Sequence, residues 1–346
     1  MKSKGEVTIY DIAKALNISA STVSRGLNDR PGVHEDTKKR ILKTADEMEY
    51  QYNIFARNLR KKRTNTIGVV LPRFNSYFMS AVIAGMENEA NRTGYNLIVS
   101  QSQESVKKEV TNISTMFNSR VDGLLVSLAC DTVNSDHFNV FFKKGIPVIF
   151  FDRVFKNADY KSIVIDNFKA GYDATTHLIE QGCKRIMHLG GNLKSNVYAD
   201  RYNGYKQALA DSGLAFNRLI EINTLNEQAG IDAANNILGM DVRPDGIFAS
   251  NDVSAVAIIC RLKESGICVP DDVAVVGFNN NPVSTVIDPN LSTIDYPGQK
   301  IGKVAASTLI KKLNNEQTQG SNTIVLKHNL VIRQSSLKKK SGSKSA

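Results

Sequence analysis

Small polar side chains and one arginine share the outward face of a short predicted helix near the N-terminus. Ser19 can begin this helix, and Val23 and Leu27 fall at the spacing of an inward apolar face. Arginine makes paired hydrogen bonds to guanine in the major groove, while serine and threonine hydroxyls reach phosphates and base edges. These residue types therefore predict a surface that contacts double-stranded DNA, formed by Ala20, Ser21, Thr22, Ser24 and Arg25.

The segment before this helix has the pattern of the first helix of a helix-turn-helix. Thr8 can cap its start together with Asp11, and Asn17 stands at the corner, where asparagine tolerates a left-handed backbone. Apolar residues recur on one helical face at Ile9, Ile12, Ala13 and Leu16. A third helix is expected from about Glu35 to Glu49, with core residues Ile41, Leu42, Ala45 and Met48. Periodicity alone fits equally a helical bundle whose polar face is only solvated.

The formal net charge of +10 lies at the two ends of the 346-residue chain. Residues 1–66 hold 14 basic and 8 acidic side chains, and residues 333–346 hold 5 basic side chains and no acidic one. The 25 basic and 26 acidic residues between these ends leave the body nearly neutral. A basic end favours a polyanionic partner, because lysine and arginine that neutralise phosphates release condensed counterions.

From residue 66 onward, short β-branched runs alternate with amphipathic helical stretches. One series of runs lies at 67–71, 97–99, 123–126 and 147–151, and a second at 163–165, 185–189, 246–249 and 273–277. This alternation indicates an α/β body of doubly wound parallel sheets, and two series indicate two lobes. Ligands of such sheets bind beyond the carboxyl ends of the strands, so two facing lobes would form a cleft.

Polar and aromatic residues that follow these runs are the candidates for the cleft. Taken singly, a polar residue in such a place is also an ordinary turn former. Carboxylate, amide and guanidinium groups make paired hydrogen bonds to vicinal hydroxyls or to a carboxylate, and aromatic rings stack on a sugar face. The candidates are Asn75, Tyr77, Phe78, Ser127, Asp152, Arg153, Asn251, Asp252 and Asn279.

The order of the residues carries a further signal. V-T-I-Y-D-I-A at 7–13 and V-S-R-G-L-N at 23–28 closely resemble the DNA-binding head of the lactose/galactose repressor (LacI/GalR) family. The resemblance continues through residues 40–42 and 49–50 and along the body to about Ser336. It implies a fold shared with periplasmic sugar-binding proteins and a sequence-specific transcription regulator that binds a palindromic DNA operator as a homodimer.

A basic linker, YNIFARNLRKKR at residues 52–63, joins the head to the first apolar run. Its five basic residues and lack of acids also suit a merely solvated linker. In the family that the chain resembles, this stretch forms a hinge helix in the minor groove, where a leucine wedges a base step open, and Leu59 stands at the matching place. The resemblance thus extends the expected DNA contacts to Thr8, Asn28, Tyr52, Asn53, Ala56, Leu59 and Arg60.

The resemblance also implies a small-molecule effector between the lobes, a sugar or a sugar derivative. Asp152 looks like the family's aspartate after its fourth strand, and Arg201, in R-Y-N-G-Y, like its ligand-contacting arginine. Asn251 matches an asparagine that contacts the effector, and Tyr296 lies where the chain crosses back between the lobes. Asn279 departs from the aspartate of many relatives, which leaves a phosphosugar, a sugar acid or a purine open as the effector.

Two other classes of protein are disfavoured. An enzyme is one, because the chain has no G-x-G-x-x-G, Walker or G-x-S-x-G motif, and Gly190-Gly191, a weak phosphate-loop signal, suits a tight turn better. The other is a transport-type sugar-binding protein, against which the predicted head and the missing signal peptide argue. Dispersed histidines and four unpaired cysteines predict no metal, no cofactor and a cytoplasmic location. No run is long enough to span a membrane.

These inferences divide the chain into four segments. A helix-turn-helix domain is expected at 1–52, a hinge at 53–65, an effector-binding and dimerisation domain at 66–335, and a basic disordered tail without leucine heptads at 336–346. Lobe one is expected at about 66–165 plus 297–328. Lobe two is expected at about 166–295 plus 329–335.

Leu59→Ala tests the wedge. Because the wedge acts where DNA is bent at a defined step, the variant is expected to weaken operator binding about tenfold more than random-DNA binding. Both affinities are measured by titration at one salt concentration. Arg60→Ala is the matched control, since loss of a phosphate contact should weaken both DNAs alike and flatten the salt dependence. Equal losses on both DNAs with Leu59→Ala would contradict the wedge.

Overall fold

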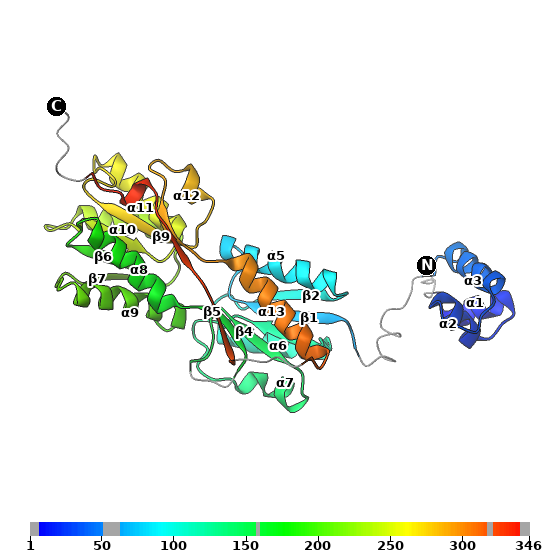
Figure 1. Cartoon of the computed structure of the whole chain (residues 1–346). Coiled ribbons are helices and arrows are strands. Elements are labelled where there is room, and N and C mark those ends of the chain that lie inside the picture. Colours follow the sequence, from blue (N-terminus) through cyan, green and yellow to red (C-terminus); the bar gives the residue numbers. More distant parts are fainter. Residues whose placement is uncertain (1–6, 51–62, 157–159, 317–320, 340–346) are drawn as a thin grey trace, which may run out of the picture. The chain divides into compact units, whose positions relative to one another are not determined.

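The chain divides into two units, residues 1–64 and 65–346. The computed structural model describes residues 7–50, 63–156, 160–316 and 321–339 (Figure 1). Each unit has its own hydrophobic core. None of the helices in these ranges has the length and apolar character needed to cross a membrane.

The N-terminal unit is a bundle of three helices, α1 (Ile9–Leu16), α2 (Ala20–Leu27) and α3 (Glu35–Glu47). Ile12, Val23 and Ile41, one from each helix, are fully buried and pack together. No single helix of this length could bury its apolar face by itself, so the core that the three helices share holds the bundle together. The predicted helix-turn-helix and its third helix are confirmed.

Local capping signals define the corner between α1 and α2. The Asp11 carboxylate accepts hydrogen bonds from the backbone N–H of Thr8 at 2.8 Å and from its hydroxyl at 2.7 Å. Asn17 adopts the left-handed conformation, with φ 54° and ψ 45°. Ser19 Oγ then accepts the backbone N–H of Thr22 at 3.1 Å and caps α2. All three signals were predicted from the sequence.

Helix α3 differs from its prediction in two details. It ends at Glu47 rather than at Glu49, which has a positive φ of 52° and so lies outside the helical conformation. Leu42 is 47% exposed, so its assignment to the core is wrong. Ile41 and Ala45 face the core one turn apart, and the residue next to Ile41 is rotated about 100° away from that face.

The C-terminal unit contains two six-stranded sheets, each of which defines a lobe. The first sheet has the order β11-β5-β4-β3-β1-β2, and all of its neighbouring strands are parallel. Its strands are β1 (Thr66–Leu71), β2 (Asn96–Gln101), β3 (Gly123–Val126), β4 (Val148–Phe151), β5 (Ser162–Ile165) and β11 (Thr323–Leu326). The run at 163–165 was the first of the second predicted series. It forms β5, which belongs to the first sheet.

The second sheet has the order β12-β10-β9-β8-β6-β7. Its neighbours are parallel except for β10 and β12, which run antiparallel. The strands are β6 (Ile186–Gly191), β7 (Arg218–Ile222), β8 (Gly246–Ala249), β9 (Ala274–Phe278), β10 (Ser292–Asp295) and β12 (Asn329–Val331). The predicted doubly wound α/β body is confirmed, with one antiparallel edge strand.

Helices cover both faces of each sheet (Figure 1). In the first lobe, α5 (Tyr77–Arg92) and α13 (Gly298–Leu313) cover one face, and α6 (Val106–Asn118), the 3-10 turn η1 (Asp136–Phe138) and α7 (Asn139–Lys143) cover the other. Side chains of β1 alternate between these layers, since Val69 packs with α5 and Val70 with α6. Strands buried on both faces explain the continuous apolar runs of the sequence.

The second lobe repeats this arrangement. Helices α8 (Asn167–Glu180) and α9 (Asn196–Asp211) cover one face of its sheet, and α10 (Glu227–Leu238) and α11 (Asp252–Glu264) cover the other. Along β6, Ile186 packs on the side of α8 and α9, and Met187 packs on the side of α10 and α11. The short α12 (Val283–Val286) and η2 (Gln334–Ser336) lie in the connections around β10 and after β12.

Four strands were not predicted, and they share weak apolar character. Strands β7, β11 and β12 are sheet edges, where half-exposed residues replace continuous apolar runs. Strand β10 is internal, but Ser292 and Thr293 on it are fully buried polar residues held by hydrogen bonds. Burial of hydroxyl groups in this strand cannot be recognised from an apolar pattern.

Ser336, placed at the start of the tail, belongs to the folded body. Its side chain is fully buried, and its Oγ lies 2.7 Å from His177 Nε2 and 2.6 Å from Ser292 Oγ. These contacts join η2 to α8 and β10. The folded body therefore includes Ser336, and residues 340–346 lie outside the described part of the chain.

Glycines allow one helix pair in each lobe to touch at the backbone. A Cβ atom on Gly302 of α13 would lie 1.9 Å from the backbone oxygen of Val82 in α5. A Cβ atom on Gly204 of α9 would lie 2.0 Å from the backbone oxygen of Phe168 in α8. Real Cβ contacts are never this short, so α13 and α9 pack this closely only because these positions lack a side chain.

Gly302→Ala is expected to destabilise the body by about 3 kcal/mol, because neither backbone can move without disturbing the α5–α13 packing. The free energy of unfolding is measured by urea titration of the full chain. Gly239→Ala is the matched control, since a Cβ there would lie 3.6 Å from the nearest atom, the backbone oxygen of Asn236. Its expected effect is within about 0.5 kcal/mol. If Gly302→Ala unfolds at the same urea concentration as the wild type, the close approach of α13 to α5 does not require glycine at this position.

Candidate DNA-contact surface and ligand cleft

Helix α2 carries the predicted DNA-contact side chains Ala20, Ser21, Thr22, Ser24 and Arg25. Ser21 and Arg25 are exposed, whereas Ala20 packs partly against the core. The hydroxyls of Ser21 and Thr22 lie 2.7 and 2.8 Å from Ser19 Oγ, so both are already engaged at the helix start. Arg25 is the long, exposed hydrogen-bond donor of this surface.

The other predicted DNA contacts fall into two groups. Thr8 is exposed, and the Asn28 amide donates to the Ser24 carbonyl at 2.6 Å, so both residues also shape the helix ends. The remaining residues lie outside the described part of the chain, and the hinge stays a prediction. They are Tyr52, Asn53, Ala56, Leu59 and Arg60.

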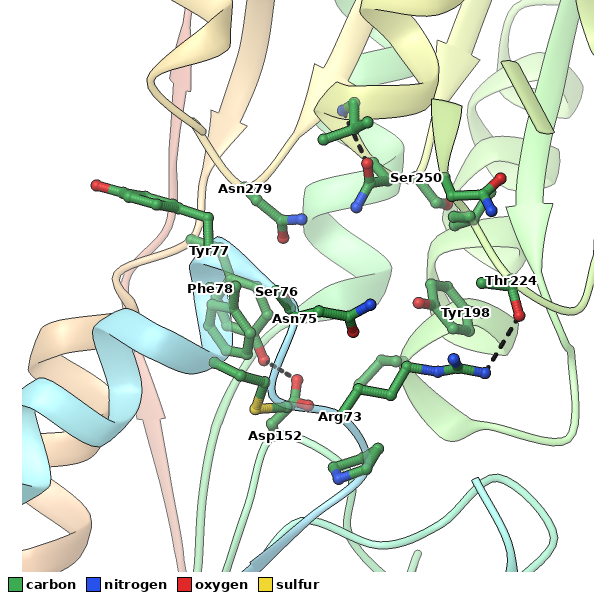
Figure 2. Close-up of a pocket in the computed structure, with 18 of the residues that line it drawn as sticks. Arg73, Asn75, Ser76, Tyr77, Phe78, Asp152, Tyr198, Thr224, Ser250 and Asn279 are labelled. Carbon is green, nitrogen blue, oxygen red and sulfur yellow. Dashed lines mark hydrogen bonds between the residues drawn. The ribbon is translucent and has the colours of Figure 1, made fainter. Parts of the chain in front are cut away.

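A cavity of about 410 Å³ lies between the two lobes, at the carboxyl ends of their strands (Figure 2). Such a cavity is large enough for a small metabolite. It brings together nine residues predicted for the cleft, namely Asn75, Tyr77, Phe78, Asp152, Arg153, Arg201, Asn251, Asn279 and Tyr296. The amide groups of Asn75 and Asn279 extend from opposite lobes toward the space between them (Figure 2).

Asp152 and two aromatic rings form one wall of the cleft. Asp152 follows β4 with φ 58°, and its Oδ1 accepts the Tyr296 hydroxyl at 2.6 Å. The Tyr296 ring stacks on Phe78, with ring centroids 4.1 Å apart. Burial raises the pKa of Asp152, while the charge of Arg153 and the hydrogen bond from Tyr296 act in the opposite direction. Tyr77, half-exposed, is directed away from Asn75 and Arg73 in Figure 2.

Arg201 is the buried cation of the cleft. Its Nε donates to Asn167 Oδ1 at 2.9 Å, and its Nη1 donates to the Ser250 carbonyl at 3.2 Å. The guanidinium lies 3.5 Å from the centroid of the Phe278 ring. Arginine carries five N–H donors, so these two hydrogen bonds leave donors for a ligand. Burial lowers the pKa of Arg201 from its ordinary value, although arginine stays charged at neutral pH.

The mouth of the cleft is bridged by polar groups that were not predicted. Arg73, which follows β1, donates to the Thr224 hydroxyl of the second lobe at 3.2 Å (Figure 2). Arg73 also lies 3.5 Å from Glu104, which pairs with Arg153. Tyr198 of α9 adds an aromatic ring 5.6 Å from the Arg153 guanidinium. Thr224 was missed because it follows β7, an edge strand without an apolar run.

Asp252 lies behind the cleft, which corrects its assignment as a ligand contact. Its Oδ1 accepts the Thr293 hydroxyl and its Oδ2 accepts the backbone N–H of Asn281, both at 2.6 Å. Burial raises the pKa of Asp252 to about 7, although these hydrogen bonds oppose the shift. Ser127 is likewise absent from the lining, and its buried hydroxyl donates to Asp152 at 3.2 Å. Asp252 and Ser127 therefore hold neighbouring groups in place by hydrogen bonds and do not contact a ligand in the cleft.

His188 is a further buried group next to the cleft. Its Nδ1 lies 2.9 Å from the Phe248 carbonyl, which can only accept, so Nδ1 carries the proton. Its Nε2 lies 3.3 Å from the hydroxyl of Ser250, a cleft residue, and accepts that hydrogen in the neutral ring. Burial lowers the pKa of His188 to about 3. The Ser250 oxygen thus keeps its lone pairs for another donor.

A helix-turn-helix head followed by a two-lobed body with an interlobe cleft defines a class of ligand-responsive transcription regulators. Family models agree with both parts: one for bacterial regulatory proteins of the lacI family matches residues 8–53, and one for a periplasmic binding protein-like domain matches residues 175–336. Curated relatives match over nearly the whole chain. The chain therefore belongs to the lacI family of bacterial regulatory proteins, DNA-binding transcription regulators.

Two of these relatives are regulators that match over almost their whole length. Catabolite control protein A of Priestia megaterium is 33% identical over 331 residues, which cover 95% of this chain and 99% of that protein. The HTH-type transcriptional regulator RegA of Clostridium saccharobutylicum is 32% identical over 332 residues, which cover 95% and 99%. A crystal structure of the Lac repressor dimer bound to operator and the anti-inducer ONPF shares the fold, with a TM-score of 0.85, 23% identity and coverage of 96% and 99%.

His188→Asn tests the burial of the neutral ring. The folded-state pKa of about 3 lies below the unfolded value of about 6.5, so only the unfolded state takes up a proton in between, and stability falls as pH drops from 6.5 toward 3. His188 then accounts for a loss of about 5 kcal/mol. The difference in unfolding free energy between wild type and variant, measured across this range, isolates the effect from other groups. A constant difference would contradict a buried, neutral His188.

Proposed function

We propose that this regulator binds a small polyhydroxylated effector in the interlobe cleft, and that the effector controls the affinity of the head for a palindromic operator. The observation that carries the proposal is the lining of the cleft, where side chains of both lobes converge. A ligand that contacts both lobes stabilises the lobe arrangement in which those contacts form.

The chemistry of the lining favours a sugar or a sugar derivative. The amides of Asn75, Asn251 and Asn279 offer donors and acceptors to neighbouring hydroxyls. Arg201 offers further donors, and the aromatic ring of Tyr198 offers an apolar face. Many relatives have an aspartate where this chain has Asn279. Without that negative charge, the cleft can also accept a ligand that carries an anionic group. A phosphosugar, a sugar acid and a purine are therefore included among the candidate effectors.

Operator recognition is proposed to involve both the head and the hinge. Arg25 is the major-groove donor, Thr8 and Asn28 add contacts at the helix ends, and Leu59 wedges the minor groove. The chain acts as a homodimer in the cytoplasm, because one head buries little DNA and a palindrome presents two equal half-sites. A binding role without turnover agrees with the family, whose relatives named above are regulators.

Thermal unfolding of the full chain with a panel of pentoses, hexoses, sugar phosphates, sugar acids and purines tests the effector. A true effector is expected to raise the unfolding midpoint, since a ligand at a hundred times its Kd stabilises the folded state by about 2.7 kcal/mol. The same compound should then change the affinity for an operator selected from random DNA. If saturating effector leaves operator affinity unchanged, the proposed coupling is wrong.

Asn75→Ala locates the effector in the cleft. Loss of one amide pair to a bound hydroxyl should weaken effector binding about tenfold and leave operator affinity without effector unchanged. Asn118→Ala is the matched control, because Asn118 is exposed at the end of α6 and does not line the cleft. Effector affinity is measured by calorimetry. If Asn75→Ala binds the effector as tightly as Asn118→Ala does, the effector does not contact Asn75 and the proposed position is wrong.

A further inference from the structure

A second cavity of about 380 Å³ also lies between the lobes. It is next to the effector cleft, since Arg153 lines both. The first lobe contributes the segments after β3 and β4, and the second lobe contributes residues 193–196 and Ala199 around the start of α9. A ligand in this cavity would therefore touch both lobes without entering the effector cleft.

The charged residues that line this second cavity are all basic. Arg153 and Lys156 come from the first lobe and Lys194 from the second, and no aspartate or glutamate of the described residues is in the lining. Arg153 and Lys156 pair with Glu104 and Asp200, two acids outside the lining. Lys194 is exposed, and its ammonium group forms no ion pair within the described ranges. The cavity therefore has an excess of positive charge.

The start of α9 lies at the edge of the same cavity, which Ser195, Asn196 and Ala199 line. The first bond inside this 16-residue helix runs from the Ala199 N–H to the Ser195 carbonyl. The three preceding N–H groups, at residues 196–198, thus have no partner within the helix, and the helix dipole makes this end positive. Asn196 lines the cavity and also accepts the Val154 N–H through its side chain at 3.4 Å.

Ser195 provides an independent sign of a missing ligand. It lines the cavity, is 4% exposed, and its Oγ is buried with no hydrogen-bond partner among the described residues. It does not cap α9, although serine is a preferred cap. A buried hydroxyl without a partner costs free energy, so a buried hydroxyl at the edge of a cavity suggests a partner that comes from outside the chain.

We propose that this second cavity is an anion site for inorganic phosphate or the phosphate group of a small metabolite. Lys194 supplies the unpaired charge, the Ser195 hydroxyl and the first amides of α9 supply donors, and Lys156 brings charge from the other lobe. Phosphate binds well at such a helix start. Gly190 and Gly191 form neither a phosphate loop nor the tight turn predicted for them, because both lie within β6. A bound anion joins the two lobes and so biases their arrangement, independently of the effector.

Titration of the full chain with inorganic phosphate, without DNA, tests the site. Phosphate is expected to raise the unfolding midpoint in a saturable way, beyond the effect of sodium chloride at equal ionic strength. Lys194→Ala and Ser195→Ala should each weaken phosphate binding about tenfold, measured by calorimetry. Ser195→Ala should not lower the midpoint measured without phosphate, because among the described residues the hydroxyl has no hydrogen-bond partner to lose.

Two control variants distinguish binding in this cavity from binding elsewhere on the chain. Lys206→Ala removes the same charge from an exposed position further along α9 and should bind phosphate like the wild type. Asn75→Ala removes an amide that lines the effector cleft and not the second cavity, and this variant should also bind phosphate like the wild type. Loss of binding in Asn75→Ala with retention in Lys194→Ala would move the anion to the effector cleft and overturn the proposal. Absence of saturable binding, or equal binding in all variants, would overturn it as well. None of these outcomes depends on the proposed effector.

Discussion

The wall of the effector cleft is built around a buried hydrogen bond, from the Tyr296 hydroxyl to Asp152 at 2.6 Å. Asp152 directly follows β4 of the first lobe, and Tyr296 lies on the chain segment between β10 of the second lobe and α13 of the first. A buried carboxylate without partners would be costly, so this bond allows an acid to lie at the junction of the lobes. The stack of Tyr296 on Phe78 then places the start of α5 in the cleft wall.

The helical head was largely predictable, because its signals are local. Thr8 with Asp11, Asn17 and Ser19 each act within four residues, and the structure shows all of them. Leu42 was misplaced because a helix-period argument cannot tell which neighbour of a core residue lies at the edge of the face. The alternation of the body was equally clear, since strands buried on both sides give continuous apolar runs.

The cleft was only partly predictable. Strand ends could be found wherever the strand itself was apolar, so Asp152 and Asn279 were recognised. Thr224 follows an edge strand, and the role of Asp252 depends on Thr293, which is distant in sequence. A sequence pattern shows that an acid follows a strand. It does not show whether that acid faces a cavity or hydrogen-bonds to its neighbours.

The glycine contacts between paired helices have a mechanical consequence. Gly302 against Val82 and Gly204 against Phe168 leave no side-chain layer that could slide, so each lobe behaves as a stiff block along that face. Deformation then concentrates in the three connections between the sheets, at 165–167, 295–298 and 326–329. A ligand that contacts both lobes therefore changes the angle between them through the conformation of these short connections.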